Sequence, residues 1–237
     1  MSYNVKYEDI GLKDYKETWD YQEEIFQRLT ENKKIKNLEK EPAEQVPGTL
    51  IFVEHPHVYT LGKSGSENNL LLSSIQLMAK EAAFYRIDRG GDITYHGPGQ
   101  IVGYPIFDLE IVGISLKDYI RLLEEAVILT LSDYGLSGSR LEGATGVWLD
   151  PDVPGMARKI CAIGVRASRY VTMHGFAFNV NTNLDYFGFI NPCGFTDKGV
   201  TSLSREKGSE QDMREVKDML KENIRKLFDI QWINSKG

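Results

Sequence analysis

The residues best suited to chemistry are the two cysteines of the chain. Cys193 lies between Pro192 and Gly194, and both neighbours are unfavourable inside a helix or a central strand, which predicts a turn. The adjacent glycine leaves room for a substrate and exposes backbone N–H groups that could hold an oxyanion. Cys161 lies in an apolar run instead, as expected of a small core residue. The pattern favours Cys193 as the nucleophile of an acyl transfer.

A reactive thiol needs a basic or cationic neighbour, because only the thiolate attacks well and a free thiol has a pKa of about 8.5. Three side chains could supply it: Lys159, His174 and His96. Lys159 begins an apolar segment, where a lysine is costly unless it is paired or neutral, although a lysine at a strand end more commonly reaches into water. The residues alone do not choose among the three.

A second unusual stretch runs from Arg89 to Gln100 and holds four glycines and a proline among polar residues. It could be a plain turn between two strands, with glycines at positive φ. The dense polar groups favour a ligand-binding loop, in which Gly90 and Gly91 let the backbone approach the ligand closely. The polar side chains that would line it are Arg89, Thr94, Tyr95, His96 and Gln100.

The sequence does not support a nucleotide or metal site. Gly62, Lys63 and Ser64 match the end of a phosphate-binding loop, but His57 stands where that motif needs a glycine. The four histidines and two cysteines lack the spacing of a structural zinc site. We therefore expect no metal and no cofactor.

The composition excludes some partners. The 237 residues include 34 Asp and Glu against 28 Lys and Arg, a formal net charge of -6, which is unsuited to binding the phosphate backbone of nucleic acids. The N-terminus lacks the features of a signal peptide, and no apolar run approaches the ~20 residues that span a bilayer. We expect a cytoplasmic protein with reduced cysteines, away from membranes.

The elements that position these residues follow from hydrophobic periodicity. Helices are expected at 13–33, 74–84, 115–134 and 209–228. Strands are expected at 49–54, 85–88, 146–150, 159–165 and 174–182, with surface loop at 34–48 and 151–158 and loop-rich chain at 183–205. In the helix at 115–134 we expect Ser115 as the N-cap, Gly135 as the stop and these side chains inward: Leu116, Tyr119, Ile120, Leu123, Ala126, Val127 and Leu131. Strands interrupted by helices predict an α+β fold.

Three segments resemble the octanoyl-[acyl-carrier-protein]:protein octanoyltransferases, which carry out the first step of protein lipoylation. They are Arg89–Pro105, Lys159–Gly164, and His174–Asn181 followed by Asn191–Gly194. The resemblance covers residues 47–205, and implies one catalytic domain over 1–237 with helical segments at both ends. Cys161 is a departure, because a small residue such as alanine is expected there.

The resemblance implies the fold of the biotin/lipoate ligase catalytic domain, a mixed, largely antiparallel sheet with packed helices. It implies that Cys193 carries the octanoyl group as a thioester and that Lys159 lowers the thiol pKa and later helps to deprotonate the incoming amine, with His174 as a possible supporting residue. The acyl site would be lined by Arg89, Gly90, Gly91, Asp92, Ile93, Thr94, Tyr95, His96, Ala162, Ile163, Gly164, Gly175, Phe176 and Ala177.

The implied donor is octanoyl-acyl carrier protein, and the implied acceptors are the lipoyl domains of 2-oxoacid dehydrogenase complexes and the glycine cleavage H protein. We expect a monomer that needs no ATP. Arg158, Lys159, Arg166 and Arg169 could form a basic docking patch or be scattered solvated charges. Three alternatives stay open: an ATP-dependent lipoate ligase of the same fold, a hydrolase using Cys193 and His174, and a non-catalytic binding protein.

Overall fold

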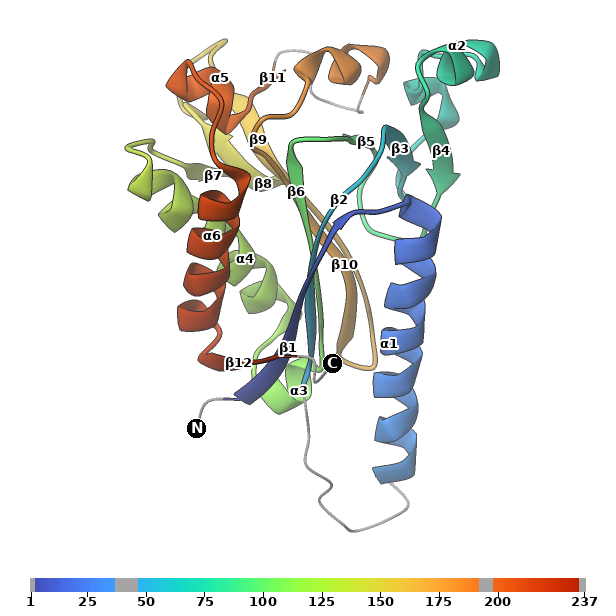
Figure 1. The fold of residues 1–237 in the computed structure, drawn as a ribbon, viewed down its shortest axis with the longest axis vertical. Coiled ribbons are helices and arrows are strands. Elements are labelled where there is room, and N and C mark those ends of the chain that lie inside the picture. Colours follow the sequence, from blue (N-terminus) through green and yellow to red (C-terminus); the bar gives the residue numbers. More distant parts are fainter. Residues whose placement is uncertain (1–2, 37–46, 192–197, 235–237) are drawn as a thin grey trace.

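A nine-stranded mixed sheet lies between two helical layers in the computed structural model (Figure 1). The structure describes residues 3–36, 47–191 and 198–234. The strands follow the order β12 (Ile230–Asn234), β1 (Tyr3–Leu12), β2 (Gly48–Glu54), β6 (Gln100–Phe107), β10 (Val171–Asn179), β9 (Arg158–Ser168), β8 (Ala144–Leu149) and β7 (Ser139–Leu141), and β11 (Gly199–Val200) pairs with β9. β1 is parallel to β12 and β2, and β11 is parallel to β9, whereas the other pairs are antiparallel.

The two faces of the sheet carry different helices. α1 (Tyr15–Lys36) covers one face, where Ile25 and Phe26 pack with Met173 of β10. α4 (Leu116–Asp133) and α6 (Met213–Leu227) cover the other face, where Leu123 packs in the cluster that contains Phe176. Successive side chains of a strand point to opposite faces, so β10 contributes to both cores. α3 (Leu109–Val112) and α5 (Leu203–Lys207) are short connections.

A smaller sheet stands beside the main one and carries the glycine-rich stretch. Its strands follow the order β4 (Ala83–Arg86), β3 (Val58–Leu61) and β5 (Ile93–His96). Its apolar cluster includes Tyr59 and Ile190, with η1 (Glu67–Asn69), α2 (Ser74–Ala79) and η2 (Leu184–Phe189) around it. β5 therefore lies within the stretch that the sequence presented as a loop.

The expected α4 is confirmed, with Ser115 accepting from the Asp118 backbone as its N-cap and Gly135 following the helix at φ 74°. Leu116 is an exception, because it is 39% exposed rather than buried in the core. The strands expected at 146–150 and 159–165 are confirmed as the antiparallel pair β8 and β9. The loop predicted at 34–48 is wrong at its edges, since α1 runs to Lys36 and β2 begins at Gly48, and its part at 37–46 lies outside the described residues.

Other boundaries differ for local reasons. α2 ends at Ala79 rather than at 84, because Glu81 adopts φ 51° and Ala82 N–H bonds to Leu77 O. The strand expected at 85–88 is therefore displaced to β4. The last helix begins at Met213 rather than at 209, because Asp212 is its N-cap and accepts from two backbone N–H groups of the first turn. None of the described helices is long and apolar enough to cross a membrane.

Candidate functional site

A cavity of about 970 Å³ lies where β9 and β10 meet the glycine-rich stretch. Of the predicted acyl-site residues, all but Tyr95 line it, together with Lys159 and His174. Cys193 lies outside the described residues. The described residues that precede and follow its segment, Asn191 and Lys198, both line this cavity.

Tyr95 belongs to the core of the small sheet rather than to the cavity. Side chains alternate along β5, so Tyr95 points away from the side taken by Thr94 and His96. Its hydroxyl lies 2.7 Å from His57 Nδ1 and its ring stacks on Tyr186 at 4.9 Å. The expectation that Tyr95 lines the site is corrected on this ground.

The glycine-rich stretch approaches the edge of β9 so closely that the strand requires glycine at the point of contact. Gly90 N–H donates to Val165 O at 2.9 Å. A Cβ on Gly164 would lie 2.7 Å from Gly90 O, closer than real Cβ contacts. The close approach seen here is to β9 rather than to a ligand, and it is Gly164 of the strand that allows it; the predicted approach of Gly90 and Gly91 to a ligand stays a prediction.

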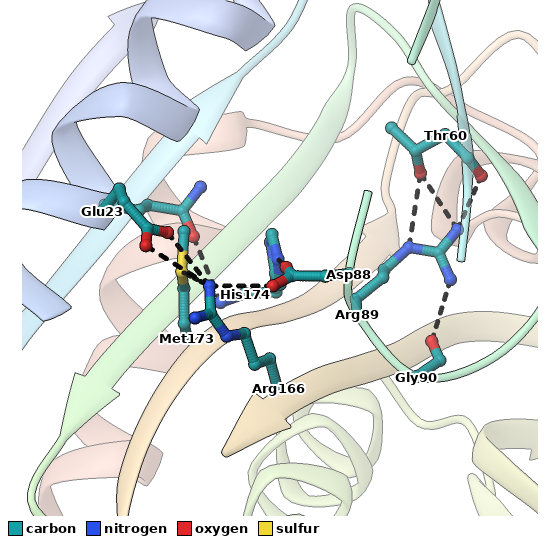
Figure 2. Close-up of polar contacts among 9 residues, drawn as sticks. Glu23, Thr60, Asp88, Arg89, Gly90, Arg166, Met173 and His174 are labelled. Carbon is teal, nitrogen blue, oxygen red and sulfur yellow. Dashed lines mark hydrogen bonds and ion pairs between the residues drawn. The ribbon is translucent and has the colours of Figure 1, made fainter. Parts of the chain in front are cut away.

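Arg89 is a buried cation in the cavity wall, with an exposed fraction of 8%. Its Nη2 atom donates to Thr60 O and to Thr60 Oγ1 at 2.7 and 3.0 Å, and its Nη1 atom donates to Gly90 O at 3.0 Å (Figure 2). Burial lowers its pKa, although arginine remains charged. The guanidinium thus joins β3 of the small sheet to the glycine-rich stretch.

His174 lies at 2% exposure in the cavity wall with a left-handed backbone, φ 61°. Its Nε2 atom lies 3.1 Å from Asp88 Oδ1 (Figure 2). Asp88 also forms an ion pair with Arg166 at 2.8 Å, and Arg166 forms a second ion pair with Glu23. Burial lowers the pKa of His174 against the opposing effect of Asp88, so the imidazole is neutral at pH 7. Nε2–H then donates to Asp88, and the buried Nδ1 has no partner among the described residues.

Lys159 reaches the cavity from the start of β9. Its Nζ donates to Thr145 O at 3.1 Å and lies 4.6 Å from the centre of the Trp148 ring. Burial lowers the pKa of this amine. Val200 of β11 lies opposite Lys159. His174 instead pairs with Val165, which lies six residues, or about 20 Å, from Lys159 along β9. Lys159 and His174 therefore occupy different ends of the cavity.

Burial decides the roles of the remaining candidate thiol, Cys161, and of the remaining candidate base, His96. Cys161 is fully buried between the sheet and α4, and burial raises its pKa, so it is confirmed as a core residue. Burial lowers the pKa of His96 to about 3, and its Nδ1 bonds to Gln100 Oε1 at 2.8 Å. Neither group is suited to act as a thiolate or as a base near pH 7.

A family model, the lipoyl protein ligase A/B catalytic domain, matches residues 14–225. The chain belongs to this family. A Flavobacterium psychrophilum protein named octanoyltransferase is 58% identical over 230 residues, 97% of this chain and 98% of its own. The Cytophaga hutchinsonii protein of the same name is 52% identical over 233 residues, 98% and 96% of the two chains. The resemblance to the octanoyltransferases is confirmed.

Solved structures of lipoate ligases share the fold. Lipoate-protein ligase A bound with ATP gives a TM-score of 0.72 at 15% identity, over 99% of this chain and 89% of that chain. The bipartite lipoate protein ligase of Thermoplasma acidophilum gives 0.72 at 15% identity, over 98% and 87%. Such low identity concerns the fold alone, and it confirms the expected α+β domain of lipoate-ligase type with a mixed, largely antiparallel sheet.

Of the two interpretations of the basic residues, the geometry favours scattered charges over a docking patch. Arg158 pairs with Glu206 and Asp150 at 2.7 and 2.5 Å, so its charge is locally compensated. Arg166 pairs with acidic residues in the same way, and it lies eight residues from Arg158 along β9, about 26 Å. Lys159 lines the cavity, so these basic residues are scattered rather than gathered on one surface.

Several lining residues were absent from the sequence-based site. Tyr15 and Tyr104 line the cavity from α1 and β6, and Leu116 and Ile120 line it from α4. This explains the exposure of Leu116, whose side chain faces the cavity rather than the core. Apolar periodicity identifies such residues only as inward-facing, so it could not separate a cavity wall from a core.

Proposed function

We propose that this chain transfers an octanoyl group from octanoyl-acyl carrier protein to a lysine of lipoyl domains, through a thioester on Cys193. The observation that carries the proposal is that Lys159 lines the same cavity as Asn191 and Lys198, the described residues around the segment of Cys193. A residue two positions from Asn191 can lie no more than about 7 Å from it. The high identity to relatives named octanoyltransferase supports the substrate.

In the first half-reaction Lys159 takes the proton of the Cys193 thiol, and the thiolate attacks the thioester carbonyl of the donor. Burial lowers the pKa of Lys159, which makes its neutral, proton-accepting form accessible. The carbon–sulfur bond to the carrier protein breaks, and the leaving thiolate takes the proton from Lys159. Backbone N–H groups stabilise the oxyanion of the tetrahedral intermediate.

In the second half-reaction the neutral amine of an acceptor lysine attacks the octanoyl thioester. Its proton passes to Lys159 while the Cys193 thiolate leaves, and an amide forms. Exchange of one thioester for another is nearly balanced, and amide formation from a thioester is favourable, so the cycle needs neither ATP nor a cofactor. The acceptors are lipoyl domains of 2-oxoacid dehydrogenase complexes and the glycine cleavage H protein, and the enzyme acts as a cytoplasmic monomer with one catalytic domain.

The residues Arg89 to Thr94, with His96, Ala162 to Gly164 and Gly175 to Ala177, form the acyl site in this proposal. A hydrolase that uses Cys193 with His174 is less favoured, because Lys198 to Val200 lead to the Lys159 end of β9 and not to His174. An ATP-dependent ligase of the same fold makes no use of Cys193, so the role of the thiol separates the two.

Intact-protein mass spectrometry tests the proposal. The chain is mixed with octanoyl-acyl carrier protein without ATP, as wild type, Cys193→Ser and Cys161→Ser. We expect one octanoyl adduct on wild type and Cys161→Ser, none on Cys193→Ser, and loss of the adduct when a lipoyl domain is added. Absence of any adduct, with lipoyl-domain modification only when ATP and octanoic acid are supplied, would refute the proposal and favour a ligase.

A further inference from the structure

One peptide group joins the amine of Lys159 to a buried carboxylate. The C=O of Thr145 accepts from Lys159 Nζ at 3.1 Å. The N–H of Gly146, which belongs to the same peptide group, donates to Glu124 Oε1 at 3.0 Å. A hydrogen bond to the N–H polarises the peptide and makes its carbonyl a better acceptor. The negative charge of Glu124 is thereby linked to the ammonium of Lys159.

The orientation of this peptide requires glycine. Gly146 has φ 123°, and a Cβ there would lie 2.4 Å from Cys161 O. β8 is held by β9 at this point through the pairing of Gly146 with Ala162. The peptide is consequently fixed by the sheet on one side and by Glu124 on the other.

Glu124 is itself held in place. It lies on α4 at 6% exposure, and its Oε2 atom accepts from Arg140 Nε at 2.9 Å. Arg140 is anchored independently by Arg121 O at 2.9 Å and Glu125 Oε2 at 2.6 Å. A buried carboxylate with both oxygens engaged has little freedom, so it can define the position of the peptide.

We propose that Glu124 is a positioning residue of the acyl-transfer site, whose carboxylate holds the peptide between Thr145 and Gly146 so that its carbonyl fixes the ammonium of Lys159. This inference rests on the proposed function, in which Lys159 exchanges protons with the reacting thiol. It explains how α4, on the side of the sheet away from α1, takes part in the chemistry at the start of β9.

The charge of Glu124 also acts on the amine. Burial lowers the pKa of Lys159, and the carboxylate of Glu124 on α4 opposes that shift, whereas the neutral thiol of Cys161 on the same strand adds no charge near pH 7. Removing the charge should therefore lower the pKa of Lys159 further. A Lys159 whose pKa falls still further is a weaker base toward the Cys193 thiol, so less thiolate forms and the first half-reaction slows near pH 7.

The test compares Glu124→Gln with Glu125→Gln. Glutamine at 124 keeps an oxygen that can accept from Gly146 N–H but removes the charge, so the variant is expected to fold. Glu125 pairs with the same Arg140 but makes no contact with the peptide, and it is 36% exposed, which makes it a matched control. Glu124→Ala removes the contact altogether.

Two quantities are measured: the titration of Lys159 by NMR of ¹³Cε-labelled lysine, assigned with Lys159→Arg, and the single-turnover rate of acylation by octanoyl-acyl carrier protein across pH. We expect Glu124→Gln to lower the pKa of Lys159 and to slow acylation about tenfold, the factor for one charged hydrogen bond, with donor binding unchanged. Glu125→Gln should change neither quantity.

The inference is overturned if Lys159 titrates in Glu124→Gln as in wild type, or if Glu125→Gln has the same effect. It is also overturned if acylation falls only in proportion to the unfolded fraction measured by circular dichroism. The NMR titration does not depend on activity. Full activity of Lys159→Ala would therefore defeat the proposed function, while the titration of Glu124→Gln would still decide whether Glu124 controls Lys159.

Discussion

The imidazole of His174 meets the carboxylate of Asp88, with Nε2 and Oδ1 3.1 Å apart, because of one backbone angle. Met173 packs on the α1 face of the sheet and Phe176 on the opposite face. Regular alternation would place His174 on the face of Phe176. The φ of 61° turns it to the α1 face instead, where Arg166, the partner of Met173 in the ladder, holds Asp88.

This backbone predicts an unusual order of stability for substitutions at His174. Alanine keeps the cost of a left-handed residue, about 1 kcal/mol, whereas glycine does not. Both variants lose the contact with Asp88. We therefore expect His174→Gly to be more stable than His174→Ala by about 1 kcal/mol in urea unfolding. Met173 has no positive φ, so the usual order of stability should hold there, and Met173→Ala should be more stable than Met173→Gly. An alanine variant as stable as the glycine variant at 174 would contradict the argument.

Buried histidines predict a loss of stability in mild acid. Burial lowers the pKa of His55 to about 4 and that of His96 to about 3, against about 6.5 in an unfolded chain. The unfolded state thus takes up protons first as the pH falls below 6.5, and the stability present above 6.5 declines toward the folded-state pKa values. Between the folded-state and unfolded-state pKa values, each histidine should make the free energy of unfolding fall by about 1.4 kcal/mol per pH unit of acidification.

Urea unfolding between pH 7.5 and pH 5 measures this slope. In that range the carboxylates remain largely ionised in both states, so histidines dominate. His55→Gln should give a shallower slope than wild type, because one titrating group is removed. A slope that is unchanged in His55→Gln, or stability that rises toward pH 5, would contradict the assignment.

The sequence predicted elements whose signals are local. α4 carries its cap at Ser115 and its stop at Gly135, and its apolar residues recur at helical spacing, so it could be found without a structure. β1 was missed because only Val5 of the strand is buried, and its partners β2 and β12 are far along the chain. Parallel pairing at such separation leaves no local pattern.

The site was predictable as a set of residues but not as an arrangement. The glycines and the polar groups of the stretch from 89 to 96 indicated a ligand loop, yet nothing in the sequence told which of Tyr95 and His96, on opposite faces of β5, faces the cavity. The left-handed His174 has no sequence signal, because only tertiary contacts hold a histidine there. The same holds for Glu124, whose link to Lys159 runs through the backbone of a third segment.

Two glycines that border the cavity should respond differently to alanine. A methyl at Gly164 meets Gly90 O at 2.7 Å, so the strain falls on the loop, which can move away from the edge of β9. A methyl at Gly175 meets Gly103 O at 2.1 Å, between paired strands of the central sheet. We expect Gly164→Ala to reduce acyl-enzyme formation at least about tenfold with a small change in stability. A loop can shift by about 1 Å with little loss of folding free energy, whereas the same shift of a wall of the site misplaces the reacting groups and slows the reaction strongly. Gly175→Ala should instead lower the free energy of unfolding by about 1–3 kcal/mol or more, the cost of overpacking.

Urea unfolding and the mass of the acyl-enzyme distinguish these outcomes. Gly188→Ala serves as the control, because the added methyl meets nothing within 4 Å, and it should leave both measurements near wild type. Equal destabilisation by Gly164→Ala and Gly175→Ala would mean that the loop is as rigidly held as the sheet. In that case the 2.9 Å bond from Gly90 N–H to Val165 O would belong to the folding core, and Arg89, which joins Thr60 to Gly90, would be a structural clamp before it is a binding residue.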